Sequence, residues 1–130
     1  MNNKGFTLIE LIVTITLLAI IATISFVSIT NVIEENKNKT CKNIETSLKT
    51  AALDYISDNR YSLTNQTITI TAKTLLDNHY LTGNIKNPYD NSSNLNLSNI
   101  NITVKLNNNY EVDKGNDAIT VAGLPNGCSK

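Results

Sequence analysis

Hydrophobic residues are distributed very unevenly along this chain. Between Phe6 and Ile33 the sequence FTLIELIVTITLLAIIATISFVSITNVI carries a single charged residue, Glu10. At ~1.5 Å per residue, a helix over this segment is longer than the ~30 Å hydrocarbon core of a bilayer. The pattern therefore predicts an apolar helix that can span a membrane.

After Ile33 the pattern becomes amphipathic. Charged residues mark a solvent-facing side, and Glu35/Lys39 and Glu45/Lys49 have the i,i+4 spacing that favours ion pairs on a helix. No Pro or Gly occurs between Phe6 and Asn59, so one helix of about 50 residues is expected. An apolar stripe recurs at steps of three and four residues and should face a sheet: Cys41, Ile44, Leu48, Ala51, Ala52 and Tyr55.

The remaining chain alternates between short strand patterns and turns. Residues 67–71 and 100–106 alternate apolar and polar positions, and Ile100, Ile102, Val104 and Leu106 share one face. Further expected elements are a short helix from Ala72 to Leu81 that ends at Gly83, a turn-forming stretch at 87–93, a turn at 107–109 into 110–112, and a third strand at 118–121. The expected fold class is α+β: a long N-terminal helix packed against a small antiparallel sheet.

Composition narrows the possible functions. The 11 basic residues balance the 11 acidic ones, which gives no net field for a nucleic acid, and no nucleic-acid partner is expected. Without the apolar segment, roughly 95 residues remain, enough for one small domain. Trp is absent and Asn is abundant, so the core of that domain should be thin.

The sequence contains no arrangement of residues typical of an enzyme. His79 is the only histidine, and a solvated or capping role fits it better than catalysis. Gly115, Gly123 and Gly127 are spaced as turn residues, with no phosphate-binding loop. Asp90, Asp113 and Asp117 carry carboxylates of the kind that bind calcium, but no metal-ligand cluster is present in the sequence. We expect no catalytic residues, no metal and no cofactor.

Glu10 argues against two simple interpretations of the apolar segment. The segment is longer than the ~7–15-residue core of a secretory signal peptide, and no small-x-small cleavage site follows it closely. A plain signal anchor explains the length, and Lys4 before the span predicts a cytoplasmic N-terminus. It does not explain Glu10, because a charged side chain in a bilayer costs at least ~2.5–3.5 kcal/mol and by default marks a functional position.

The residues Lys4-Gly5-Phe6-Thr7-Leu8-Ile9-Glu10 resemble the signature K-G-F-T-L-[IV]-E of type IV pilins. The resemblance extends from Lys4 to about Asn31. It implies cleavage between Gly5 and Phe6 by a membrane prepilin peptidase and methylation of the new amino group of Phe6. It also implies three parts: a leader (1–5), a transmembrane and assembly helix (6–33) and an extracellular or periplasmic globular domain (34–130).

Physical chemistry suggests a role for each residue of this motif. Gly5 lacks a side chain, so the backbone can approach the peptidase closely. After cleavage, Glu10 can pair with the Phe6 amine of a neighbouring subunit. A buried ion pair of this kind does not necessarily add net stability, but it is well suited to fixing the register between the two helices.

The resemblance implies a structural subunit of a type IV pilus filament, used in adhesion, motility, aggregation or DNA uptake. Its implied partners are other pilins, the prepilin peptidase, the assembly platform and the assembly ATPase. The implied locations are the inner or cytoplasmic membrane before assembly and the cell-surface pilus afterwards. Two alternatives remain: a pseudopilin of a type II secretion or competence system, and a membrane-anchored binding domain that does not polymerise.

The two cysteines, Cys41 and Cys128, suit an exported domain. A disulfide between them would tie the C-terminal tail to the helix and close a loop of about 87 residues, worth roughly 4–5 kcal/mol in the chain-entropy model. Two unpaired thiols, one of them simply buried, are the alternative. Pilins often tie down their C-terminal region with a disulfide, commonly to a strand instead of this helix, and on that resemblance we expect the bond.

Overall fold

The computed structural model describes residues 5–115 and 117–128, and the chain divides into two compact units, residues 1–36 and 37–130. Helix α1 (Leu8–Asp58) runs through both units with 51 residues. The expected long helix is confirmed. It continues without a break because no proline or glycine lies within it. Within the described residues, α1 is the one helix whose length and composition allow it to cross a membrane.

The first unit presents an apolar helix surface whose polar groups are satisfied locally. Phe6, Leu8 and most other large apolar side chains up to Ile33 are exposed within this chain. The hydroxyls interspersed among them, those of Thr14, Thr16, Thr23 and Ser25, each donate a hydrogen bond to a carbonyl three or four residues earlier. Such internal bonds remove the penalty for an unsatisfied hydroxyl in hydrocarbon, so these residues are compatible with a bilayer.

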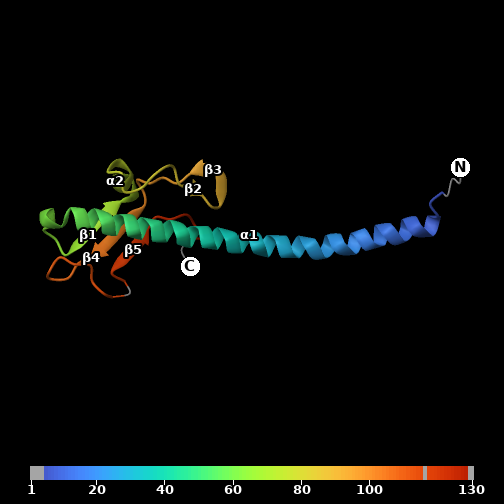
Figure 1. Ribbon diagram of the computed structural model, residues 1–130, viewed down its shortest axis with the longest axis horizontal. Coiled ribbons are helices and arrows are strands. Elements are labelled where there is room, and N and C mark those ends of the chain that lie inside the picture. The colour runs from blue at the N-terminus through green and yellow to red at the C-terminus, as the bar shows by residue number, and fades with distance from the viewer. Residues whose placement is uncertain (1–4, 116, 129–130) are drawn as a thin grey trace. The chain divides into compact units, whose positions relative to one another are not determined.

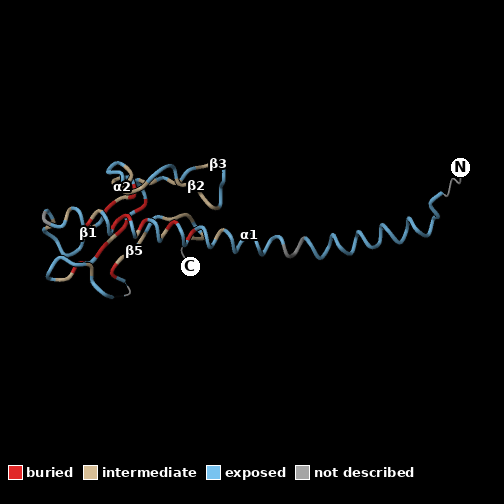
Figure 2. The backbone as a smooth tube through the Cα atoms, viewed as in Figure 1, coloured by how far each residue is buried: buried red, intermediate tan, exposed pale blue. Residues whose placement is uncertain are grey.

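In the second unit the amphipathic part of α1 buries the expected stripe. Cys41, Ile44, Leu48, Ala51 and Ala52 are buried and Tyr55 is half-buried, while Ile56, not included in the predicted stripe, is also buried. One of the two predicted ion pairs, Glu45/Lys49, is present in this unit, with Lys49 Nζ 2.6 Å from Glu45 Oε1. Figure 2 shows the buried positions along this part of α1.

A three-stranded antiparallel sheet covers that stripe. Its strands are β1 (Thr67–Thr71), β4 (Asn101–Lys105) and β5 (Ile119–Ala122), in the order β1-β4-β5. In Figure 1 the strands lie beside the green part of α1, and Ile70, Ile102 and Val104 join Leu48 in one core cluster. The opposite face carries threonines, with Thr69, Thr103 and Thr120 directly opposite one another. The α+β fold with a helix packed on a small antiparallel sheet is confirmed.

Helix α2 (Ala72–Asp77) follows β1 directly and is shorter than predicted. Thr71 caps its start, since its hydroxyl accepts a bond from the Thr74 N–H. The prediction of a helix to Leu81 was wrong because His79 adopts a left-handed conformation, with φ 64°. The His79 N–H then bonds to the Leu76 carbonyl and the Tyr80 N–H to the Leu75 carbonyl, a Schellman motif that ends the helix.

A small hairpin occupies the stretch that was predicted to form turns throughout. Strand β2 (Lys86–Asn87) pairs with β3 (Asp90–Asn94), with a register shift between Lys86 and Asn87. Only Pro88 and Tyr89 form the connecting turn. The prediction was therefore partly wrong: polar residues dominate both strands, so they show no apolar alternation that could have revealed them.

Two loops link the sheet back to the helix. A short 3₁₀ helix, η1 (Arg60–Ser62), follows α1, and the Arg60 guanidinium lies 3.3 Å from Glu111 and donates a bond to the Asn109 carbonyl. The predicted turn at 107–109 leads to an isolated bridge between Leu106 and Val112. After β5, Gly123 has φ 88° and passes so close to the Asn99 carbonyl that no side chain fits there.

Candidate processing and assembly site

The described N-terminal segment begins with Gly5 and Phe6, and α1 starts two residues after Phe6. Thr7 occupies the N-cap position. Its N–H and hydroxyl both donate to Glu10 Oε2, at 2.9 and 2.8 Å, and its hydroxyl oxygen accepts the Glu10 N–H at 3.3 Å. This reciprocal arrangement is a capping box, which satisfies amide groups that the first helical turn leaves without partners.

The capping box fixes where the Glu10 carboxylate points. Both hydrogen bonds end on Oε2, and within the described residues no hydrogen bond reaches Oε1. Glu10 lines a shallow hollow of about 340 Å³ together with Phe6, Ile9, Val13 and Thr14. The negative charge thus sits in an otherwise apolar patch, with one carboxylate oxygen engaged locally and the other open to a further partner.

Gly5 and Phe6 are both exposed within the described part of the chain. A Cβ at Gly5 would meet no atom within 4 Å, and Phe6 is 82% exposed. Lys4 and the other residues before Gly5 in the expected leader lie outside the described residues. The structure therefore places Gly5, Phe6 and Glu10 within two turns of one another, as consecutive parts of one exposed segment.

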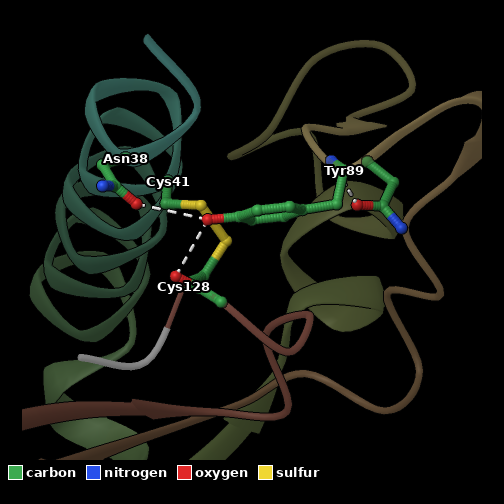
Figure 3. Close-up of a disulfide and its surroundings, with 6 residues drawn as sticks. Asn38, Cys41, Tyr89 and Cys128 are labelled. Carbon is green, nitrogen blue, oxygen red and sulfur yellow. Dashed lines mark hydrogen bonds between the residues drawn. A yellow bond between two sulfur atoms is a disulfide. The ribbon is translucent and has the colours of Figure 1, made fainter. Parts of the chain in front are cut away.

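The cysteines form a second cluster, in the unit of residues 37–130. The structure joins Cys41 and Cys128 by a disulfide with a Cα–Cα distance of 5.2 Å, a usual separation for such a bond. Figure 3 shows Tyr89 beside this disulfide, with its hydroxyl between Asn38 and the C-terminal segment. The disulfide thus connects the amphipathic part of α1 to the chain's tail.

Within the described residues, His79 and Asp90 have local structural roles. His79 is exposed at the end of α2, where its backbone forms the helix cap. Among the described residues, no three His, Cys, Asp or Glu side chains lie close enough together to hold a metal ion. Asp90 instead accepts bonds from the Ser92 hydroxyl and N–H, which lower the pKa of its carboxyl.

Comparison with known protein families agrees with the N-terminal geometry. Residues 1–26 match the family model of the prokaryotic N-terminal methylation motif. The chain carries the class III signal of type IV pilins and pseudopilins. This signal supports a pilin- or pseudopilin-like prepilin, and it implies processing by prepilin peptidase and membrane anchoring through the apolar helix. We found no match to the chain among curated proteins or solved structures.

The pilin-type signal contains one contributor that the sequence analysis missed. The sequence predicted no separate role for Thr7 within the motif. In the structure, Thr7 is the N-cap residue of α1 and donates two hydrogen bonds to Glu10. A signal for this role was present, because Thr-x-x-Glu before an apolar run is the sequence pattern of a capping box. Tyr89 was also missed, and no local pattern marks it.

Proposed function

We propose that this chain is a structural subunit of a type IV pilus filament. Prepilin peptidase cuts between Gly5 and Phe6, and the new Phe6 amine is methylated. Before assembly, the subunit is a single-pass membrane protein with a cytoplasmic N-terminus. Residues 6–33 then form the helical centre of the filament and residues 34–130 its outer surface. Other pilins, the assembly platform and its ATPase are the partners in this step.

The observation that carries the proposal is the half-satisfied carboxylate of Glu10 in an exposed apolar helix. A helix that only anchored the chain would be more stable in lipid without this charge, whose insertion costs at least ~2.5–3.5 kcal/mol. The capping bonds from Thr7 offset part of that cost and hold the carboxylate in one position. The Oε1 atom stays available for the Phe6 amine of a neighbouring subunit, which would set the stagger between the two helices.

Capping and pairing between subunits make different demands on position 10, so they can be separated by substitution. A capping box accepts Gln as well as Glu, because it needs only a side-chain oxygen that accepts the N-cap N–H. Pairing with a cationic amine needs the charge. Glu10→Gln therefore keeps the cap and removes the pair, while Thr7→Val weakens the cap and keeps the charge.

The test follows Glu10→Leu, Glu10→Gln and Thr7→Val chains in cells that lack the wild-type copy, or follows the chain's own incorporation if another pilin forms most of the filament. Mass spectrometry should find each chain starting at Phe6 with one added methyl. Incorporation into sheared filaments should fall about a hundredfold or more for both Glu10 variants, because an unpaired buried cation costs about 3–5 kcal/mol. Thr7→Val should still assemble.

Three results would contradict parts of this proposal. Normal incorporation of Glu10→Leu would refute the pairing of Glu10 with the Phe6 amine of a neighbouring subunit. Rescue of assembly by Glu10→Gln, together with failure of Thr7→Val, would assign Glu10 to capping alone. A mature chain that starts beyond Ile33 would point to ordinary signal-peptide cleavage.

A further inference from the structure

Three segments that are distant in sequence meet at the disulfide. Helix α1 contributes Asn38 and Cys41, the β2–β3 turn contributes Tyr89, and the tail contributes Gly127 and Cys128. The Tyr89 hydroxyl oxygen lies 3.2 Å from Asn38 Oδ1 and 3.0 Å from the Gly127 carbonyl oxygen, either of which can accept its single proton. Figure 3 shows this hydroxyl next to the bond between the two sulfurs.

The fit around Tyr89 is specific. Gly127 has φ 106°, and a Cβ on it would lie 2.6 Å from Tyr89 Cζ, so only glycine lets the tail pass this close to the ring. The Lys37 ammonium lies 5.3 Å from the ring centroid, within the range of a cation–π contact. Tyr89 therefore contacts both helix α1 and the C-terminal tail.

The β2–β3 hairpin has little else to hold its tip. None of the residues in β2 or β3 is buried, and the pairing breaks register between Lys86 and Asn87. An isolated two-stranded hairpin is at best marginally stable in water. Ile85 and Leu95 pack against the core at the base of the hairpin, and one backbone hydrogen bond joins them. The tip depends on Tyr89, and one of the two Tyr89 acceptors belongs to the tail that the disulfide restrains.

We propose that the Cys41–Cys128 disulfide acts through Tyr89 as a redox-dependent clasp that orders the β2–β3 hairpin. Reduction by a small dithiol proceeds by thiolate attack on one sulfur and displacement by the second thiol. Two electrons and two protons pass to the protein, giving two Cys thiols and an oxidised, cyclic reductant. The freed tail then withdraws the Gly127 carbonyl from Tyr89, and the hairpin tip loses one of the two acceptors that hold its hydroxyl. The hairpin is thus more ordered in the oxidised protein than in the reduced one.

The test is hydrogen exchange of the full-length protein in detergent micelles, read by mass spectrometry for residues 86–94 and for β4 as an internal reference. Dithiothreitol should raise the exchange rate of the hairpin about tenfold or more. Oxidised Tyr89→Ala should show a similar rise with β4 still protected, and adding dithiothreitol to it should give little further increase. The matched control is Tyr110→Phe beside Tyr89→Phe. The two tyrosines are 38% and 36% exposed, and of their two hydroxyls only that of Tyr89 has a hydrogen bond to the described part of the tail.

Every outcome decides the proposal. Increased hairpin exchange in Tyr89→Phe and Tyr89→Ala but not in Tyr110→Phe supports the clasp. Unchanged hairpin protection in oxidised Tyr89→Ala overturns it. If reduction of the wild type exposes β4 as well, or leaves the hairpin as protected as before, the disulfide does not act as a clasp on the hairpin and the proposal is overturned. Additive effects of reduction and Tyr89→Ala, with β4 still protected, would show that the disulfide acts on the hairpin by another route and would overturn the coupling.

Discussion

Two leucines on the same helix provide a quantitative test of how α1 packs on the sheet. Leu48 is 0% exposed and lies in the core cluster with Ile102 and Val104, whereas Leu53 is 36% exposed. Truncating a fully buried leucine to alanine removes its transfer free energy and leaves a cavity, at a cost of about 2.7–5 kcal/mol. The same truncation at Leu53 should cost only about 1 kcal/mol, because this side chain is partly in solvent and its removal leaves no closed cavity. Helix propensity changes equally at both sites.

The measurement is thermal and urea unfolding of a soluble fragment of residues 34–130 with its disulfide intact. A domain of roughly 100 residues has a stability of about 5–15 kcal/mol, so Leu48→Ala removes a large share. At about 4–8 °C for each kcal/mol, its Tm should fall by roughly 11–40 °C, while Leu53→Ala should lower the Tm by only about 4–8 °C. Similar losses for the two variants would refute the packing of this helix face on the sheet.

The other predictions concern the disulfide and one tyrosine. Cys128→Ser should lower the stability of the same fragment by up to about 4.6 kcal/mol, the loop-entropy value for an 87-residue separation, and the reduced wild type should unfold at the same urea concentration as this variant. Peptide mapping without reductant should link Cys41 to Cys128. Full thiol labelling of the native protein would contradict the bond. The Tyr80 hydroxyl donates to Asp58, which raises the Tyr80 pKa. This stabilising effect is complete below the usual tyrosine pKa of about 10 and is lost as pH rises through the higher folded value, so Tyr80→Phe should flatten the alkaline fall in stability, and identical curves would contradict the role.

The elements that could be predicted from the sequence are those with one buried and one solvated face. The strand pattern of Ile100–Leu106 appeared in the structure with all four apolar residues buried, because strict alternation leaves one assignment of faces. The apolar stripe of α1 was recognisable for the same reason. The end of α2 was not, since it depends on His79 adopting a left-handed conformation that only a minority of non-glycine residues take. The β2–β3 hairpin was missed because neither of its strands buries a face.

The two candidate sites differ in the same way. Gly5, Phe6 and Glu10 lie within six consecutive residues, so a local motif was sufficient to single them out, and the capping box with Thr7 could have been found from the same pattern. Tyr89 acts through partners 51 and 38 residues away, and no local signal specifies such contacts. Long-range sites of this kind become visible only once the topology brings the segments together.

The two units can form independently, because the hydrogen bonds of the first are local and the contacts of the second are long-range. In the first unit every hydrogen bond described above closes within four residues, from the capping box to the hydroxyls along the apolar helix. Such a helix can form in a membrane without any other part of the chain and still leave its apolar surface free for other helices. The second unit depends on contacts across many residues, the disulfide above all. Substitutions at the disulfide should therefore leave membrane insertion and cleavage after Gly5 unchanged, because neither step needs the second unit to be folded. Substitutions at Glu10 should leave the unfolding of residues 34–130 unchanged.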